Sequence, residues 1–223
     1  MLNFRLKTKS QRRKNMNSEA EIENWRKSWK TTKRGRILSI NDISNIDDII
    51  CESVKRSYAP SVQNTALKQG KYGSAKLQIP RQECEPVLID ALLKVYSKKT
   101  ITEQQFIDWE TTLAKNIREI YHKNEIKLYT YGNAQKWINI AIKYLFSSDH
   151  IDHNHNLFEV CFLPIDRIIQ DKAYKELGVK KLPVAWSKCD NWQDILDYEK
   201  NIKNAIKQKT SYISRLWWEC NAW

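Results

Sequence analysis

Residues 134–146 have the clearest pattern of apolar and polar positions in the chain. At 100° per residue, the polar side chains fall within one narrow stripe of a helical wheel, and apolar side chains cover the wide remaining arc. The polar residues are Gln135, Lys136, Asn139 and Lys143. Such a pattern predicts a mostly buried helix whose stripe either meets solvent along a thin edge or lines a cleft. Lysines at a thin edge extend to solvent, whereas apolar cleft walls favour a neutral amine, and both alternatives remain open.

Apolar residues recur every three to four positions along most of the chain, which predicts a mainly α-helical fold. Only 5 Gly and 5 Pro occur in 223 residues, so few tight hairpins are expected. Thr100 and Glu103 have capping-box spacing, and Pro86 and Pro164 suit the first turn of a helix. Residues 59–80 predict the longest loop. Helices are expected from Ser18 through Trp25 and Trp29, and over about 41–57, 86–96, 100–122, 134–146, 164–175 and 190–208.

Positive charge is concentrated near the start of the chain. Residues 1–36 hold 12 of the 38 Lys and Arg but only 3 of the 26 Asp and Glu. We expect residues 1–17 to form a disordered basic arm and residues 18–223 to form one helical domain. Such an arm suits the phosphate backbone of a nucleic acid or an anionic membrane surface, and it is also typical of tails that promote solubility.

The cysteine and histidine patterns indicate neither disulfides nor a metal site. Five cysteines without a C-x-x-C pair predict reduced, mostly buried thiols. His150, His153 and His155 have no usual zinc spacing, so no metal is expected there. The chain also lacks an apolar run near 18 residues and the apolar core of a signal peptide, which predicts a cytoplasmic protein.

Two short elements thirty positions apart carry the candidate chemistry. Gly132-Asn133-Ala134-Gln135-Lys136 has small residues at its first and third positions and a lysine at its fifth. Small residues at a tight helical hairpin allow backbone amides to approach a phosphate. Leu163-Pro164-Ile165-Asp166-Arg167 places a carboxylate in the first turn of a predicted helix. The first element offers an amine, and the second offers a base.

These elements resemble the helix-hairpin-helix DNA glycosylases, whose hairpin reads G-x-G-x-K before a buried helix and whose later helix opens with Pro-x-Asp. They are most similar to the archaeal 8-oxoguanine branch, in which Gln-Lys begins an apolar helix, a second lysine follows and Pro-x-Asp-x-Arg comes later. The match covers residues 128–175, although Ala134 stands where glycine is usual and residues 129–132 replace a Leu-Pro-Gly entry. The resemblance implies a two-lobed, mainly α-helical HhH-GPD fold, with a hairpin at about 120–146 and a cleft between the lobes.

The resemblance also implies roles for individual residues. Lys136 would be the nucleophile and Asp166 the base that activates it. Lys143 would lie at the recognition pocket, with the rest of the stripe facing the nucleotide. A C-terminal segment would close this pocket, although Trp217 and Trp218 fit equally well as core anchors of the last helix. The implied substrate-binding residues are Lys143, Gln135, Asn139, Trp217, Trp218, Glu219 and Trp223, and the implied DNA-binding residues are Gly132, Asn133, Ala134 and Arg167.

The implied activity is that of a DNA glycosylase with AP-lyase activity, which flips and excises a base such as 8-oxoguanine or a hypermodified phage base. Its partner would be double-stranded DNA, with no membrane involved, and the enzyme would be a monomer at the nucleoid that serves base excision repair or antiviral defence. No cofactor is expected, apart from a monovalent cation at the hairpin. If Asp166 activates water, the enzyme is monofunctional. A non-catalytic, defence-associated nucleic-acid-binding protein is the alternative from another class.

Overall fold

The computed structural model describes residues 23–24, 45–62, 65, 67, 72–210, 212 and 214–220. Over these residues the protein contains no β-strand, and the expected mainly α-helical character is confirmed. The α-helices are α3 (Ile46–Val62), α4 (Ser74–Tyr96), α5 (Glu103–Lys123), α6 (Tyr131–Ser147), α7 (Leu157–Val160), α8 (Arg167–Lys172), α9 (Trp192–Lys209) and α10 (Arg215–Cys220). A π-helical turn, η2 (Ala173–Leu177), follows α8, and a 3₁₀ turn, η3 (Trp186–Lys188), precedes α9.

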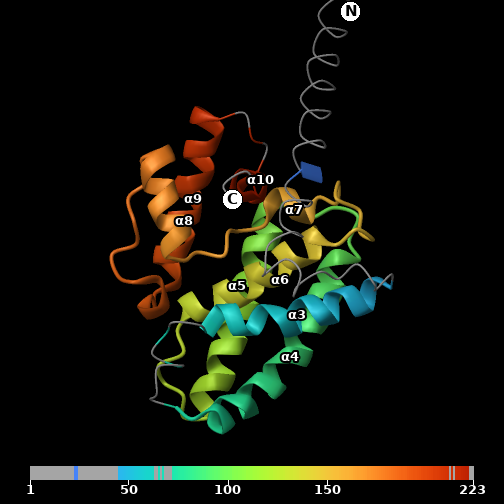
Figure 1. The fold of residues 1–223 in the computed structure, drawn as a ribbon, viewed down its shortest axis with the longest axis vertical. Helices are drawn as coiled ribbons and strands as arrows, with labels where there is room; N and C mark the ends of the chain where they lie inside the picture. Colours follow the sequence, from blue (N-terminus) through green and yellow to red (C-terminus); the bar gives the residue numbers. More distant parts are fainter. Residues whose placement is uncertain are drawn as a thin grey trace, which may run out of the picture.

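In Figure 1 the helices form two groups, α3 to α7 and α8 with α9. Buried side chains of residues 49–162, together with Leu216, Trp217 and Cys220, form a first hydrophobic core. Buried side chains of residues 163–206, together with Trp218, form a second. Tyr131 and Trp192 pack against both cores. The first turn of α6 therefore lies where the two cores meet.

Helix α6 is the centre of the first core, packed against α3 and α5. Every residue from Gly132 to Ser147 is buried, which confirms the mostly buried helix that the apolar pattern predicts. Burial extends to all four polar residues of the stripe. The stripe consequently meets other parts of the protein instead of a broad solvent-exposed edge.

The N-cap of helix α5 lies two residues later than the sequence predicts. Its capping box consists of Thr102 and Gln105, whose side chains bond reciprocally to each other's backbone amides. The prediction of Thr100 and Glu103 was wrong because the chain contains two overlapping pairs with the same spacing. Ile101, buried and bound through its N–H to Asn156, is held outside the helix.

Helix α4 contradicts the predicted start at Pro86. It begins at Ser74 and contains both Pro80 and Pro86. Each internal proline removes a backbone hydrogen bond, but burial along one face of the helix offsets this cost. The buried residues of α4 are Leu77, Pro80, Cys84, Leu88, Leu92 and Val95. Since α3 also continues to Val62, the predicted loop over residues 59–80 is shorter than expected.

Residues 161–166 connect the two cores without helical structure. The prediction that Pro164 opens the next helix was therefore wrong. Asp166 caps α8, and the helix begins at Arg167.

All five cysteines are free and four are buried, which confirms the predicted thiols. None of the helices in the described part of the chain combines the length and apolar character needed to cross a bilayer. The predicted basic arm, Trp25, Trp29 and Trp223 lie outside the described residues, and of the predicted helix from Ser18 only residues 23–24 are described, as helical.

Candidate active site

The amine of Lys136 and the carboxylate of Asp166 form an ion pair. Lys136 lies in the second turn of α6, and its Nζ is 3.2 Å from Oδ2 of Asp166. The other carboxylate oxygen of Asp166, Oδ1, accepts the N–H of Ile169 at 3.0 Å, which caps α8. The two side chains are 10% and 21% exposed, so the pair lies near the surface. At this separation, a proton can pass directly from the amine to the carboxylate.

An indole ring covers one side of this pair. The Nζ of Lys136 lies 4.2 Å from the centre of the Trp186 ring, within the range of a cation–π interaction. Trp186 opens η3 and is partly exposed. The sequence pattern did not indicate this residue, although a tryptophan in the non-periodic stretch 183–189 is a signal that could have found it. The amine thus has a flat aromatic wall on one side and a carboxylate on another.

Gly132 allows η3 to approach α6. Its N–H donates to the carbonyl oxygen of Cys189 at 2.9 Å. A Cβ atom at this position would lie 1.7 Å from the carbonyl oxygen of Trp186, which is closer than any side chain allows. Thr130 adds a hydrogen bond from its Oγ1 to the carbonyl oxygen of Ser187 at 3.2 Å. The glycine predicted to approach a phosphate therefore lies against the protein's own backbone.

The amides of Asn133 and Ala134 also have acceptors within the protein. Both donate to the carbonyl oxygen of Thr130 at 3.1 Å, and the side chains of Thr130 and Asn133 form the capping box of α6. The turn between α5 and α6 consequently covers residues 124–130, and the predicted hairpin residues Gly132, Asn133 and Ala134 belong to the start of α6. All three residues expected to bind DNA at the hairpin are buried. Arg167, the fourth, is exposed at the start of α8.

Each remaining polar residue of the α6 stripe contacts a different part of the chain. Gln135 is hydrogen-bonded to the backbone of Ile165. Asn139 donates to Oε1 of Glu110 on α5 at 2.7 Å. Burial raises the pKa of Glu110 well above its ordinary value, although the hydrogen bond from Asn139 opposes this shift. The polar stripe is thus matched by polar groups that come from distant segments.

Helix α10 supplies the partner of Lys143. The Nζ of Lys143 lies 2.5 Å from Oε1 of Glu219, and both side chains are buried. This contact places Glu219 beside the stripe, where the resemblance expects a C-terminal helix to close the pocket. Trp217 packs in the first core against Phe146, with ring centres 6.2 Å apart. Trp218 belongs to the second core, so both tryptophans anchor α10.

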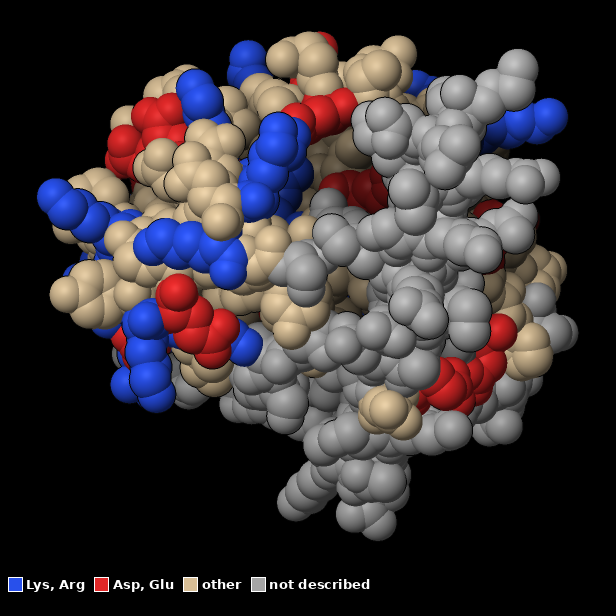
Figure 2. All heavy atoms as spheres, turned by 90° about the horizontal axis from the view of Figure 1, so that it is seen from above, with Lys and Arg blue, Asp and Glu red and all other residues tan. Residues whose placement is uncertain are grey.

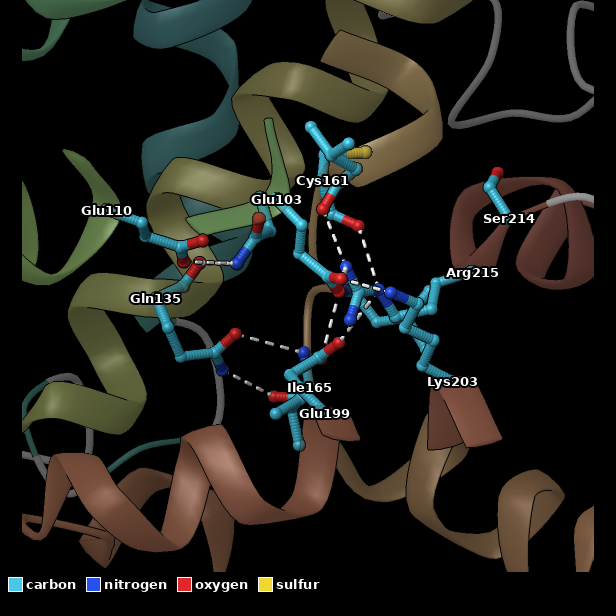
Figure 3. A network of polar contacts seen from close by, with 12 residues as sticks. Glu103, Glu110, Gln135, Cys161, Ile165, Glu199, Lys203, Ser214 and Arg215 are labelled. Carbon is cyan, nitrogen blue, oxygen red and sulfur yellow. Dashed lines mark hydrogen bonds and ion pairs between the residues drawn. The ribbon is translucent and has the colours of Figure 1, made fainter. Parts of the chain in front are cut away.

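Arg215 holds the start of the 161–166 segment (Figure 3). Its buried guanidinium donates to the carbonyl oxygens of Val160 and Cys161 at 2.6 and 3.1 Å. It also pairs with Glu199 at 3.5 Å and with Glu103 at 3.4 Å. The sequence pattern did not indicate this cluster, because a glutamate and an arginine at helical positions usually face solvent.

The side chains of Glu103, Glu199 and Arg215 line a cleft of about 350 Å³ between α5 and α9. The cleft is also lined by the apolar side chains of Ile107, Phe162 and Leu196 and by Lys203. Lys203 pairs with Glu103, so charges of both signs are already matched within this cleft. Neither Lys136 nor Asp166 lines it. The cleft is therefore separate from the Lys136–Asp166 pair.

Glu199→Gln will change how the free energy of unfolding depends on pH. Burial raises the pKa of Glu199 from 4.5 to about 7, against the opposing influence of Arg215. Between these two pH values the folded state holds a proton that the unfolded state has lost. The stabilisation of the folded state by this proton is complete below about pH 4.5 and disappears as pH rises through 7. Glutamine cannot lose a proton, and its Oε1 can still accept the N–H of Leu163.

The variant's unfolding free energy minus that of the native protein should therefore increase between pH 4.5 and 7 and stay constant above this range. Urea denaturation at a series of pH values measures this difference. Glu119→Gln, at an exposed position of α5, is the control and should show no comparable trend. A pH-independent difference for Glu199→Gln would contradict the assignment.

The three histidines of the 150–155 stretch do not converge. His153 and His155 contact the carbonyl oxygens of Ser148 and Lys98, both at 2.9 Å. His155 also stacks on Tyr96, with ring centres 4.4 Å apart. Across the described ranges, no group of three or more His, Cys, Asp or Glu side chains is arranged to hold a metal ion.

The structure brings the two predicted catalytic residues together. Gln135 and Lys143 lie on the same helix as Lys136, and Glu219 of α10 pairs with Lys143. The predicted amide donors Gly132, Asn133 and Ala134 are buried, and so are Trp217 and Trp218. Comparisons with protein-family models, curated proteins and solved structures found no match.

Proposed function

We propose that the protein is a DNA glycosylase with AP-lyase activity, in which Lys136 is the nucleophile and Asp166 the base. The observation that carries this proposal is the 3.2 Å contact between the two side chains, which come from elements thirty positions apart. The Trp186 ring beside the amine adds a flat surface of the kind that holds an extruded base or sugar. Amine, carboxylate and aromatic wall are the groups that this chemistry requires.

The proposed reaction begins when Lys136 transfers a proton to Asp166 and its amine attacks C1′ of the flipped nucleotide. The bond from C1′ to the base breaks, and the base leaves with the electron pair and then takes up a proton. Loss of a second proton from the nitrogen opens the sugar ring at O4′, which is protonated, and leaves a Schiff base. Removal of a C2′ proton then expels the 3′ phosphate and cleaves the strand.

The fold expected from the resemblance is part of this proposal. We infer a two-lobed HhH-GPD arrangement in which the two hydrophobic cores correspond to the two lobes. Lys136 belongs to a helix of the first core, and Asp166 immediately precedes the first helix of the second. A nucleotide bound at their junction would contact both lobes. The pairing of Glu219 with Lys143 supports a pocket closed by α10.

Two lysine-rich segments of the second core support double-stranded DNA as the partner. Residues 200–209 contain four lysines and no acidic residue, and residues 172–181 contain four lysines and one glutamate. The segments are joined where Nζ of Lys209 donates to the carbonyl oxygen of Leu177 at 2.6 Å. Figure 2 shows lysine and arginine side chains, interspersed with acidic ones, over the side of the molecule where α8 and α9 lie. Phosphate contacts of this kind provide sequence-independent affinity that falls with salt.

A panel of duplexes, each with one modified base, tests the proposed function. Release of at least one base is expected, with an abasic product and strand cleavage at the same site. Asp166→Asn should slow the release strongly, because the carboxylate no longer accepts the proton. The non-catalytic alternative predicts salt-sensitive binding, no abasic product from any duplex and little effect of Asp166→Asn. That result would overturn the proposal, whereas base release without strand cleavage would limit it to a monofunctional glycosylase.

A further inference from the structure

We propose that Gln135 is a positioning residue that fixes the carboxylate of Asp166 relative to the amine of Lys136. This inference rests on the proposed function. It differs from the substrate-binding role that the resemblance implies, since Gln135 would act on the reaction through Asp166 and not through the nucleotide.

The side-chain amide of Gln135 holds the residue before Asp166 at two points (Figure 3). Its Oε1 accepts the N–H of Ile165 at 3.1 Å, and its Nε2 donates to the carbonyl oxygen of the same residue at 2.9 Å. The second Nε2 hydrogen bond goes to the carbonyl oxygen of Gly132 at 3.0 Å. Gln135 is 1% exposed, so these contacts are shielded from water. Its amide is therefore bonded to backbone on every side.

The order of residues makes this contact specific to the catalytic pair. Gln135 directly precedes Lys136 on α6, and Ile165 directly precedes Asp166. Two hydrogen bonds thus connect the neighbours of nucleophile and base, and a shift of the 161–166 segment along α6 would break both. Glutamine offers both a donor and an acceptor at this length without having to bind a proton, as a glutamic acid would.

Apart from the ion pair of Asp166 with Lys136 and its cap on α8, the other polar contacts of the 161–166 segment lie further from Asp166. Arg215 binds the carbonyl oxygens of Val160 and Cys161, and Glu199 accepts the N–H of Leu163 at 3.1 Å. These groups hold the start and middle of the segment. Because the non-helical segment continues to residue 166, the Gln135 contact is the last one before the carboxylate. A misplacement of about 1 Å in a reacting group can reduce a rate by on the order of 10²-fold.

Gln135→Met tests this role, because methionine is similar in length but makes neither hydrogen bond. The probe is a duplex with a single abasic site, and the reading is the single-turnover rate of the borohydride-trapped adduct together with the Kd of the duplex. We expect the rate to fall by roughly 10²-fold while the Kd stays within about twofold of the native value. A raised Kd with an unchanged rate would show that Gln135 contacts the nucleotide and would overturn the proposal.

A double-variant comparison separates positioning from general destabilisation. If Gln135 acts through Asp166, adding Gln135→Met to Asp166→Asn should slow adduct formation no further than Asp166→Asn alone. Fully additive losses would overturn the positioning role. Asn156→Ala removes a comparable amide-to-backbone contact, to the N–H of Ile101, and should leave the rate of the folded protein unchanged. No adduct with the native protein would overturn the proposed lyase function itself, which is a distinguishable result.

Discussion

Lys136→Gln will abolish the covalent adduct that borohydride traps between the protein and a duplex with an abasic site. The adduct requires an amine that forms a Schiff base with the sugar, and a glutamine amide cannot do so. Loss of a nucleophile typically reduces a rate by 10³-fold or more. Gel electrophoresis of the reduced mixture measures the adduct directly.

The surroundings of Lys136 make this substitution a clean test. Glutamine is polar and slightly shorter, and Asp166 keeps its hydrogen bond to Ile169, so the cap of α8 survives. Lys94→Gln is the matched control, because Lys94 also pairs with a carboxylate, that of Asp90 at 2.6 Å, but lies on the exposed face of α4. The control should form the adduct at the native rate. An adduct of native yield in Lys136→Gln would assign the chemistry to another amine.

Gly132→Ala will destabilise the protein by about 3 kcal/mol, the upper part of the usual range for overpacking a filled site. The added Cβ would lie 1.7 Å from the carbonyl oxygen of Trp186, and a backbone atom cannot rotate away as a side chain can. Either α6 or η3 must shift, which weakens the hydrogen bond from Gly132 to Cys189. Urea denaturation measures the free energy of unfolding.

The same substitution should also slow adduct formation by the folded protein, because η3 carries the Trp186 ring that faces Lys136. Gly73→Ala is the control: a Cβ at Gly73 meets no atom within 4 Å, and the residue has an ordinary φ of −60°. Its unfolding free energy should stay within about 0.5 kcal/mol of the native value. Equal effects at the two glycines would contradict the close approach of η3 to α6.

The buried helix α6 could be predicted from sequence because its signal is local. Residues 134–146 alone contain the period of the helix, the wide apolar arc and the narrow polar stripe. Helix starts were harder to place where local rules fit two positions. Thr100 and Thr102 both begin a capping pattern, and only the burial of Ile101 favours the second.

The residues that contact the polar stripe of α6 could be predicted only where they belong to a sequence motif. Asp166 was recognised because Pro164-Ile165-Asp166-Arg167 and Gln135-Lys136 match a known family pattern. Trp186 has no such motif, and its position depends on how closely η3 approaches Gly132. The pairing of Arg215 with Glu199 joins residues on α10 and α9, and no local pattern distinguishes them from surface charges.

The role of Lys136 as the nucleophile is tested most directly by locating the trapped adduct with mass spectrometry. The native protein is reduced with borohydride in the presence of the abasic duplex, digested with protease and nuclease, and the modified peptide is sequenced. If Lys136 is the nucleophile, the sugar remnant will be attached to its Nζ. A remnant on any other amine, or no modified peptide at all, would contradict this role.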